Sequence, residues 1–215
     1  MADAMADSGG DLFWQSYKTV TKDDYVLSLF RITGDAQGQR IPGQGSKGPL
    51  LLQHGFLTDS ITWFTNLTDE DELSVGSQLF LEGYDVWLGN IRGSRNSREH
   101  VHLDPDEDNV QFWDFSYPEF GMIDLPAMLQ LIKDNQDEQN RCKKISYVGH
   151  SQGTIMAFYG LSHARNPSRY ISQFVALAPC FVGGFPEYYS APGENTYRLL
   201  ATALAVFGIE SLFGP

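Results

Sequence analysis

Short apolar runs alternate with helical patterns along most of the chain, and this alternation restricts the folds open to it. The strand-like runs are PLLLQ (49–53), YDVWLG (84–89), ISYVG (145–149) and FVALAP (174–179). Helical patterns lie between them, at 71–83, 123–136 and 151–165. Strands that alternate with helices in this way predict an α/β fold, in which helices flank a mostly parallel sheet.

The remaining segments follow simpler patterns. SYKTVT (16–21) and YVLSLFRI (25–32) are separated by three polar residues, and they predict a β-hairpin. The Gly- and Pro-rich stretch 34–49 predicts a surface loop. Residues 90–120 predict a long polar and aromatic loop, and residues 1–11 a disordered leader.

Charge and cysteine content exclude several classes of function. The chain has 27 Asp and Glu residues against 15 Lys and Arg residues, a net charge of -12, so it lacks the basic surface of a nucleic-acid-binding protein. The acidic runs at 69–72, 104–108 and 134–138 predict solvated surface. Neither Cys142 nor Cys180 has metal-ligand spacing, and we expect buried free thiols. We therefore expect no metal and no other cofactor.

The residues GHSQG at 149–153 lie where a predicted strand meets a predicted helix. In an open parallel sheet, chemistry gathers at the carboxyl ends of the strands. A sharp turn at this point crowds the residues two before and two after its centre, and Gly149 and Gly153 have no side chain to clash. Such a turn holds the Ser151 hydroxyl clear of the sheet and directs the N–H of Gln152 toward a developing oxyanion. The motif alone is weak, but its context predicts that Ser151 is a nucleophile.

A second turn agrees with this interpretation. The buried strand at 49–53 runs directly into His54, Gly55 and Phe56. Alone, this His-Gly pair fits an ordinary turn. Beside a nucleophilic serine, it predicts that the N–H of Phe56 is the second oxyanion donor.

Four blocks of sequence carry a family resemblance. LLLQHGFLTDSITWF, GYDVWLGNIRGSRNSREH, FWDFSYPEFGMIDLPA and YVGHSQGT together resemble the acid lipase family, the α/β-hydrolases that include the gastric and lysosomal acid lipases. The resemblance covers about residues 16–180 and keeps the order and spacing of the family. It implies the N-terminal part of an α/β-hydrolase core in residues 12–182 and the beginning of a cap or lid in residues 183–215.

The resemblance also implies an activity. It is the hydrolysis of carboxylic esters of neutral lipids, triacylglycerols or sterol esters, through an acyl-enzyme on Ser151 at a lipid–water interface. Phe56 and Gln152 are then the oxyanion donors. The residues that support the two turns are Gly149, His150, Gly153, His54 and Gly55. In the second block, residues 83–100, Asn90, Arg92 and Gly93 follow a strand end. They either touch substrate or, as we expect, brace the long loop through Arg–carboxylate hydrogen bonds.

The base that should activate Ser151 is missing from the sequence pattern. In the α/β-hydrolase chain order, the triad acid and histidine follow the serine. Only His163 does so, and it lies 12 residues along the same predicted helix, roughly 18 Å away. Earlier histidines are in the oxyanion turn, beside the serine or in the long loop: His54, His150, His100 and His102. We therefore expect a chain that lacks the last strands of the sheet and the triad acid and histidine.

Two alternatives follow from the missing base. The chain encodes either the front part of a lipase or a catalytically inactive fragment or lipid-binding pseudoenzyme. The leader has no basic and apolar regions of a signal peptide, whereas the resembled family is mostly secreted or lysosomal, so the compartment stays open. No apolar run is long enough for a transmembrane helix. The oligomeric state and the acyl-chain preference also stay open.

Overall fold

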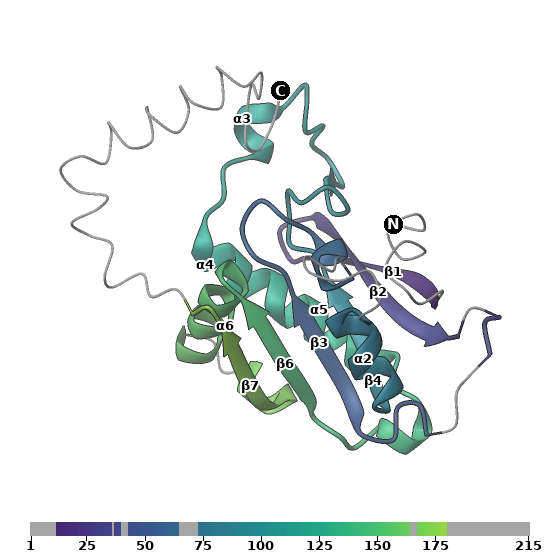
Figure 1. Cartoon of the computed structure of the whole chain (residues 1–215). Helices are drawn as coiled ribbons and strands as arrows, with labels where there is room; N and C mark the ends of the chain where they lie inside the picture. The colour runs from purple at the N-terminus through teal and green to yellow at the C-terminus, as the bar shows by residue number, and fades with distance from the viewer. Residues whose placement is uncertain (1–11, 36, 40–42, 65–72, 164–166, 180–215) are drawn as a thin grey trace.

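A twisted sheet organises the part of the chain that the structure describes. The computed structural model describes residues 12–35, 37–39, 43–64, 73–163 and 167–179. Within these residues the sheet has seven strands in the order β1-β2-β4-β3-β6-β7, and β5 pairs with β2 (Figure 1). The strands are β1 Phe13–Val20, β2 Tyr25–Gly34, β3 Gly48–Gln53, β4 Tyr84–Gly89, β5 Glu99–His100, β6 Ile145–His150 and β7 Ile171–Leu177.

The sheet combines an antiparallel edge with a parallel centre. β1 and β2 form the expected antiparallel hairpin, and β2 is also antiparallel to β4. Strands β4, β3, β6 and β7 are parallel to one another. Parallel strands end at one common edge, so the residues that follow β3, β4, β6 and β7 meet there. The expected α/β architecture with a mostly parallel sheet is therefore confirmed.

The two faces of β3 enter different cores. Leu51 belongs to the same core as Trp87, Tyr147 and the helical residues Met128 and Met156, on one face of the sheet. Leu50 and Leu52 point to the opposite face and pack with Phe80. Every residue of β3 is buried. This burial on both faces explains why residues 49–52 are apolar without alternation; the buried polar residue Gln53 ends the strand.

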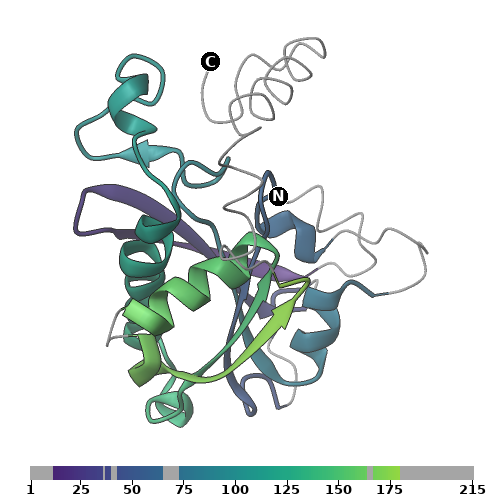
Figure 2. The same cartoon turned by 90° about the vertical axis from the view of Figure 1, so that its left-hand side faces the viewer.

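Helices cover both faces of the sheet. α5 (Leu125–Asp134) and α6 (Gln152–His163) contribute to the first core, whereas α2 (Val75–Leu81) contributes to the second. In Figure 2 the green α6 and the blue α2 lie on opposite sides of the sheet. No described helix is long and apolar enough to span a membrane.

Shorter helices connect these elements. They are the 3₁₀ helices η1 Ser60–Trp63 and η3 Glu138–Asn140, the α-helices α3 Asn109–Phe112, α4 Tyr117–Glu119 and α7 Pro167–Tyr170, and the π-helix η2 Phe120–Asp124. The π-helix lies between α4 and α5, so one helical stretch changes its hydrogen-bond pattern over five residues. Such π-turns inside helices often occur at functional sites.

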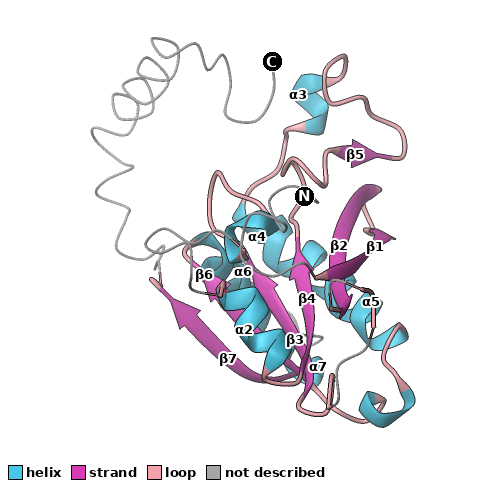
Figure 3. Ribbon diagram, turned by 45° about the vertical axis from the view of Figure 1, so that its right-hand side comes forward, coloured by secondary structure: helices cyan, strands magenta, loops and turns pink. Residues whose placement is uncertain are grey.

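Several predicted boundaries differ from the structure. The expected loop at 90–120 contains β5 and two short helices, and this segment projects beyond the carboxyl edge of the sheet (Figure 3). The helix expected over 71–83 begins only at Val75, after the N-cap Ser74. The strand expected over 174–179 spans Ile171–Leu177 and ends before Ala178, whose φ is 46°. The leader 1–11 and the expected cap start 183–215 lie outside the described residues.

The expectation of buried thiols is wrong for Cys142. Cys142 is exposed, because it lies in the polar turn between η3 and β6, before β6 begins at Ile145. Its neighbours Arg141 and Lys143 are charged. Cys180 lies outside the described residues.

Two glycines allow η2 to touch α6. A Cβ on Gly160 would lie 2.7 Å from the carbonyl oxygen of Gly121 and 2.8 Å from Leu125 Cδ2. Both distances are too short for carbon, and a backbone carbonyl cannot rotate away as a side chain can. Residue 160 therefore has to be glycine for the π-helix to pack against the helix that follows Ser151.

This contact predicts the effect of Gly160→Ala. Alanine normally favours a helix over glycine by about 1 kcal/mol, but here the clash with Gly121 outweighs this gain. We expect the free energy of unfolding to fall by about 1–2 kcal/mol, measured by urea denaturation. Ser162→Ala, at an exposed position of the same helix, is the control and should stay close to wild type. A Gly160→Ala variant more stable than wild type would contradict the close packing.

Candidate active site

Ser151 occupies a strained turn between β6 and α6. Its φ is 49°, in the left-handed region that residues other than glycine seldom adopt. The backbone around it is held on both sides. Its N–H donates to the Leu177 carbonyl at 2.9 Å, and its own carbonyl accepts bonds from the N–H and hydroxyl of Thr154 at 2.9 and 2.6 Å. The structure thus has the sharp strand-to-helix turn at Ser151, and α6 begins one residue later than expected because Ser151 itself is not helical.

Close packing explains the two glycines of this turn. A Cβ on Gly149 would lie 2.7 Å from the carbonyl carbon and oxygen of Gly153. A Cβ on Gly153 would lie 2.8 Å from the carbonyl oxygen of Gln53. The Tyr147 hydroxyl donates to the Gly153 carbonyl at 2.7 Å and fixes the start of α6. Neither position can accept a side chain without moving backbone.

The turn at His54–Phe56 lies directly against the serine. In the parallel pair of β3 and β6, Gln53 is opposite Gly149, so both chains leave the sheet at the same level. A Cβ on Gly55 would be 3.3 Å from Ser151 Cβ and 2.9 Å from His150 Nδ1. The structure therefore brings together the residues that the sequence selected for the two turns.

His54 braces this turn from inside the protein. The side chain is buried, and its Nδ1 lies 2.8 Å from the Gly55 carbonyl oxygen. Its Nε2 accepts the N–H of Ile91 at 3.4 Å. These partners require the neutral tautomer with the proton on Nδ1. Burial lowers the pKa of His54 below its ordinary value, against the raising effect of the Gly55 carbonyl and Asp59. His54 is thus a support of the turn, and both of its nitrogens are engaged.

A pocket of about 550 Å³ opens beside the two turns. Apolar side chains from η1, from the loop after β4 and from η2 form part of its wall: Ile61, Ile91 and Phe120. Phe56 and Leu57 contribute more apolar surface, and their residues are 38% and 58% exposed. Gln152 also lines the pocket, so the residue after the serine and the turn at His54–Phe56 face one space.

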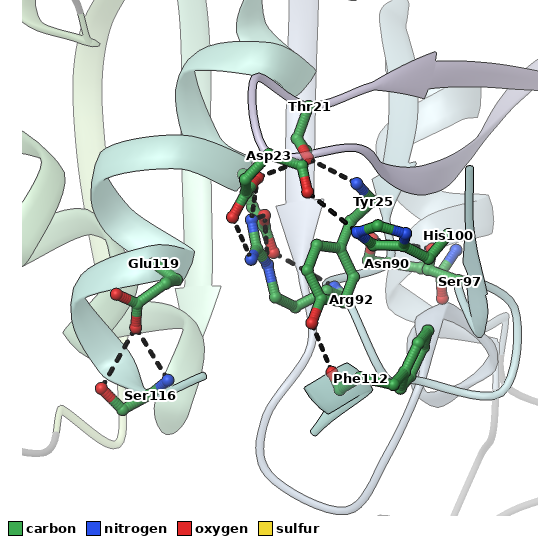
Figure 4. Close-up of polar contacts among 11 residues, drawn as sticks. Thr21, Asp23, Tyr25, Asn90, Arg92, Ser97, His100, Phe112, Ser116 and Glu119 are labelled. Atoms are coloured by element: carbon green, nitrogen blue, oxygen red, sulfur yellow. Dashed lines mark hydrogen bonds and ion pairs between the residues drawn. The ribbon is translucent and has the colours of Figure 1, made fainter. Parts of the chain in front are cut away.

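A buried arginine holds the loop that forms one wall of the pocket (Figure 4). The Arg92 side chain is 1% exposed and forms ion pairs with Asp124 at 2.7 Å and Asp23 at 2.6 Å. The Arg92 N–H also donates to Asp124, at 3.1 Å. The guanidinium lies 4.1 Å from the ring centroid of Tyr25. The expectation that Arg92 braces the long loop is confirmed, with carboxylates from the β1–β2 turn and from η2.

The three charges of this cluster shift one another. Burial raises the pKa of Asp124 to about 6, although Arg92 acts to lower it. Burial would also raise the pKa of Asp23, but hydrogen bonds from Arg92 and Thr21 bring it below its ordinary value. For Arg92, burial acts to lower the pKa, and the two carboxylates raise it above its ordinary value. The arginine therefore stays charged in the protein interior.

Further hydrogen bonds tie the start of this loop to the sheet. The Asn90 side chain accepts the N–H of Ser60 at 3.0 Å and donates to the Ser28 carbonyl at 3.1 Å. The Ser97 hydroxyl donates to the Asn90 carbonyl at 3.0 Å and accepts the N–H of Ser28 at 2.9 Å. Gly93 packs closely against the rings of Trp113 and Phe115. A Cβ at this position would lie 2.6 Å from Trp113 and 2.8 Å from Phe115, which is too short for carbon.

The other described histidines have separate positions. His100 Nε2 lies 3.0 Å from the Asp23 carbonyl oxygen, and its Nδ1 accepts the N–H groups of His102 and Leu103. His102 is exposed and lies 3.6 Å from Asp24. His163 ends α6, twelve residues after Ser151. His150 is exposed, and its ring lies beside Gly55, so it borders the turn at His54–Phe56.

Some residues of the site have no local sequence signal. Asp23 stands in a hairpin turn and Asp124 at a helix start, where acidic residues are common for other reasons. Ser97 is one polar residue among many in its loop. Each joins the site through a long-range contact, which a pattern along the chain cannot show. Within the described residues, no group of three or more His, Cys, Asp or Glu side chains is arranged to hold a metal ion.

Comparison with known proteins agrees with this geometry. A family model described as "alpha/beta hydrolase fold" matches residues 48–202, and one described as "partial alpha/beta-hydrolase lipase region" matches residues 11–67. The chain belongs to the α/β-hydrolase family, in its acid lipase branch.

Named relatives are identical to this chain at up to about two-fifths of the aligned positions. It is 41% identical to lipase member M of Mus musculus over 201 residues, which are 93% of this chain and 43% of the relative. It is 39% identical to gastric triacylglycerol lipase of Rattus norvegicus over 166 residues, 77% of this chain and 39% of the relative. It is 38% identical to human lysosomal acid lipase/cholesteryl ester hydrolase over 165 residues, 77% of this chain and 39% of the relative. The chain thus spans less than half of these relatives.

A solved structure supports the fold alone. The esterase Pf2001 of Pyrococcus furiosus superposes with a TM-score of 0.57 at 18% identity, over 96% of this chain and 66% of the esterase. At this identity the likeness concerns the arrangement of strands and helices.

The buried His54 predicts a pH dependence of stability. Above about pH 6.5 histidine is neutral in both the folded and the unfolded chain. Below this pH the unfolded chain binds a proton that the folded chain binds only at lower pH, so acid favours unfolding. Asp124 acts in the opposite sense: its raised pKa makes the folded chain bind a proton between about pH 6 and pH 4. A comparison with a His54 variant separates the two effects.

We expect His54→Asn to remove this acid sensitivity. Asparagine keeps a side-chain N–H for the Gly55 carbonyl and does not titrate. Wild type should lose about 1 kcal/mol or more of stability relative to the variant between pH 7.5 and pH 5, measured by urea denaturation. His163→Asn, at the exposed end of α6, should leave the difference unchanged. Parallel curves for wild type and His54→Asn would contradict a buried neutral His54.

Replacement of Arg92 should lower the free energy of unfolding much more than replacement of Arg98. Arg92→Gln leaves Asp124 buried without its charged partner, so we expect the free energy of unfolding to fall by about 3–5 kcal/mol. Arg98→Gln removes an arginine that pairs with Asp106 at the surface, and little change is expected. Thermal unfolding of both variants at pH 7 measures the difference. Equal losses would show that the burial of Arg92 has no energetic consequence.

Proposed function

We propose that this chain carries the nucleophile and oxyanion site of a carboxylic ester hydrolase. The observation that carries the proposal is the left-handed Ser151 between β6 and α6, packed against the turn at His54–Phe56. Two close glycines permit the strained backbone of Ser151, and the second turn beside it lines a pocket. This arrangement fits acyl transfer better than a purely structural turn.

The proposed mechanism uses the two turns together. A base removes the proton of the Ser151 hydroxyl, and the oxygen attacks the ester carbonyl. The N–H groups of Phe56 and Gln152 stabilise the negative charge on the carbonyl oxygen. Collapse of this intermediate releases the alcohol, which takes the proton, and leaves an acyl-enzyme on Ser151. Attack by water then forms the carboxylic acid and restores the serine. We place the base and its acid partner outside the described residues.

The substrate proposal rests on the pocket and the relatives. Phe56, Leu57, Ile61, Ile91 and Phe120 offer apolar surface to an acyl chain. Two relatives are named for the lipids they cleave, a triacylglycerol and a cholesteryl ester. We therefore propose neutral lipid esters, met at a lipid–water interface, as substrates of the whole protein. The same names, gastric and lysosomal, support a secreted or lysosomal compartment.

Substitution of Ser151 tests the nucleophile. In the whole protein, where the base is present, we expect Ser151→Ala to abolish labelling by a serine-directed fluorophosphonate and to lower the hydrolysis of a p-nitrophenyl ester by about four orders of magnitude in kcat. Ser162→Ala, on the exposed face of the same helix, is the matched control and should behave as wild type. Retained hydrolysis in Ser151→Ala would contradict the proposal. An unlabelled, inactive wild type would favour the alternative, a lipid-binding protein without catalysis.

A further inference from the structure

Three arginines at equal spacing mark the loop after β4, and they differ in their partners. Arg92 pairs with Asp23 and Asp124, and Arg98 pairs with Asp106 through both of its terminal nitrogens. Arg95 lies between them, is exposed and lines the pocket. Within the described residues, Arg95 forms no ion pair and no hydrogen bond through its side chain. In a chain with 27 acidic and 15 basic residues, an unpaired arginine beside a pocket requires an explanation.

Tight turns hold the backbone that presents Arg95. The N–H of Ser94 donates to the Ile91 carbonyl at 3.1 Å, and the N–H of Ser97 donates to the Ser94 carbonyl at 2.8 Å. The N–H of Gly93 donates to the Ser97 carbonyl at 3.0 Å. Arg95 thus stands at the tip of a closed turn. At the base of this turn, the side chains of Asn90 and Ser97 form hydrogen bonds with the backbone of Ser28 in β2. Its backbone position is fixed, although its side chain reaches solvent.

The pocket beside Arg95 is amphiphilic. Its apolar wall contains Ile61, Ile91 and Phe120. Asp59, the acidic residue among the described lining residues, accepts the N–H of Ile61 at 2.8 Å and caps η1. The Arg92 charge is balanced inside the protein by two carboxylates. The guanidinium of Arg95 is therefore the unpaired positive charge that the described lining of the pocket offers to a ligand.

We propose that the pocket binds an anionic amphiphile, a long-chain carboxylate, with its apolar chain on the Ile61–Ile91–Phe120 wall and its carboxylate on Arg95. A guanidinium can donate two parallel hydrogen bonds to a carboxylate, and an unbranched chain fits an apolar wall. The ligand class is shared by a free fatty acid and by a lipid with a phosphate head. We assign the carboxylate, because the proposed hydrolysis releases one; this assignment rests on the proposed function, whereas the binding of an anion does not.

Calorimetric titration of the whole chain tests the inference with three ligands of equal chain length: decanoate, decyl phosphate and 1-decanol. We expect wild type to bind decanoate more tightly than decanol. Because an exposed ion pair contributes modestly, Arg95→Gln should weaken decanoate binding about three- to fivefold and leave decanol binding unchanged. High salt should reduce the advantage of decanoate in wild type.

Arg98→Gln is the matched control, since it removes the same charge from the same loop outside the pocket. It should leave the binding of both ligands unchanged. The inference is overturned if wild type shows no preference for decanoate, if Arg95→Gln weakens both ligands equally, or if Arg98→Gln has the same effect. Binding of decyl phosphate without decanoate overturns the carboxylate assignment.

A Ser151→Ala variant separates this inference from the proposed function. It should bind decanoate as wild type does, because the carboxylate contacts Arg95 and not the serine. Loss of esterase activity together with retained decanoate binding supports the inference independently of catalysis. A wild type that hydrolyses esters but shows no effect of Arg95→Gln on decanoate refutes the inference and leaves the proposed function intact.

Discussion

The parallel pairing of β3 with β6 determines where the chemistry of this protein can lie. Gln53 and Gly149 are neighbours in that pair, so the chain leaves both strands at one edge and at one level. The turn after β3 then contacts the turn after β6, and Gly55 lies against Ser151. The hydrogen bonds between β3 and β6 fix which residues stand opposite each other. A shift of this register would therefore separate Phe56 from Ser151. The pocket and the proposed nucleophile and oxyanion donors all depend on this one alignment.

A buried charge cluster supplies the second constraint. Burying a guanidinium is costly unless carboxylates and hydrogen bonds compensate, and Arg92 has two carboxylates, a backbone contact and an aromatic ring beside it. Its partners come from the β1–β2 turn and from the π-helix, which itself touches α6 through Gly121 and Gly160. The loop of Arg92 reaches His54 through the N–H of Ile91. Both turns of the site are thus connected through these contacts to the same short π-helix, η2.

Local patterns predicted the elements that short-range physics determines. The run PLLLQ marked a strand buried on both faces, and the glycines around Ser151 marked a turn too crowded for side chains. The boundaries near Ser74 and Ala178 were missed by a few residues, because capping and a left-handed backbone end these elements. Asp23 and Asp124 could not be predicted as partners of Arg92. Their sequence separations from Arg92 are 69 and 32 residues, and their meeting depends on the whole sheet.

The two titratable supports of the site respond to acid in opposite ways, and this follows from their different burial and charge. His54 is neutral and buried, so acid protonates the unfolded chain first and lowers the stability of the folded chain. Asp124 is a buried acid whose pKa is about 6, so the folded chain takes up its proton first and gains stability on acidification. Arg92 still keeps Asp23, whose pKa is lowered, so the cluster retains one ion pair when Asp124 is neutral. On acidification, His54 and Asp124 therefore change the free energy of unfolding with opposite signs.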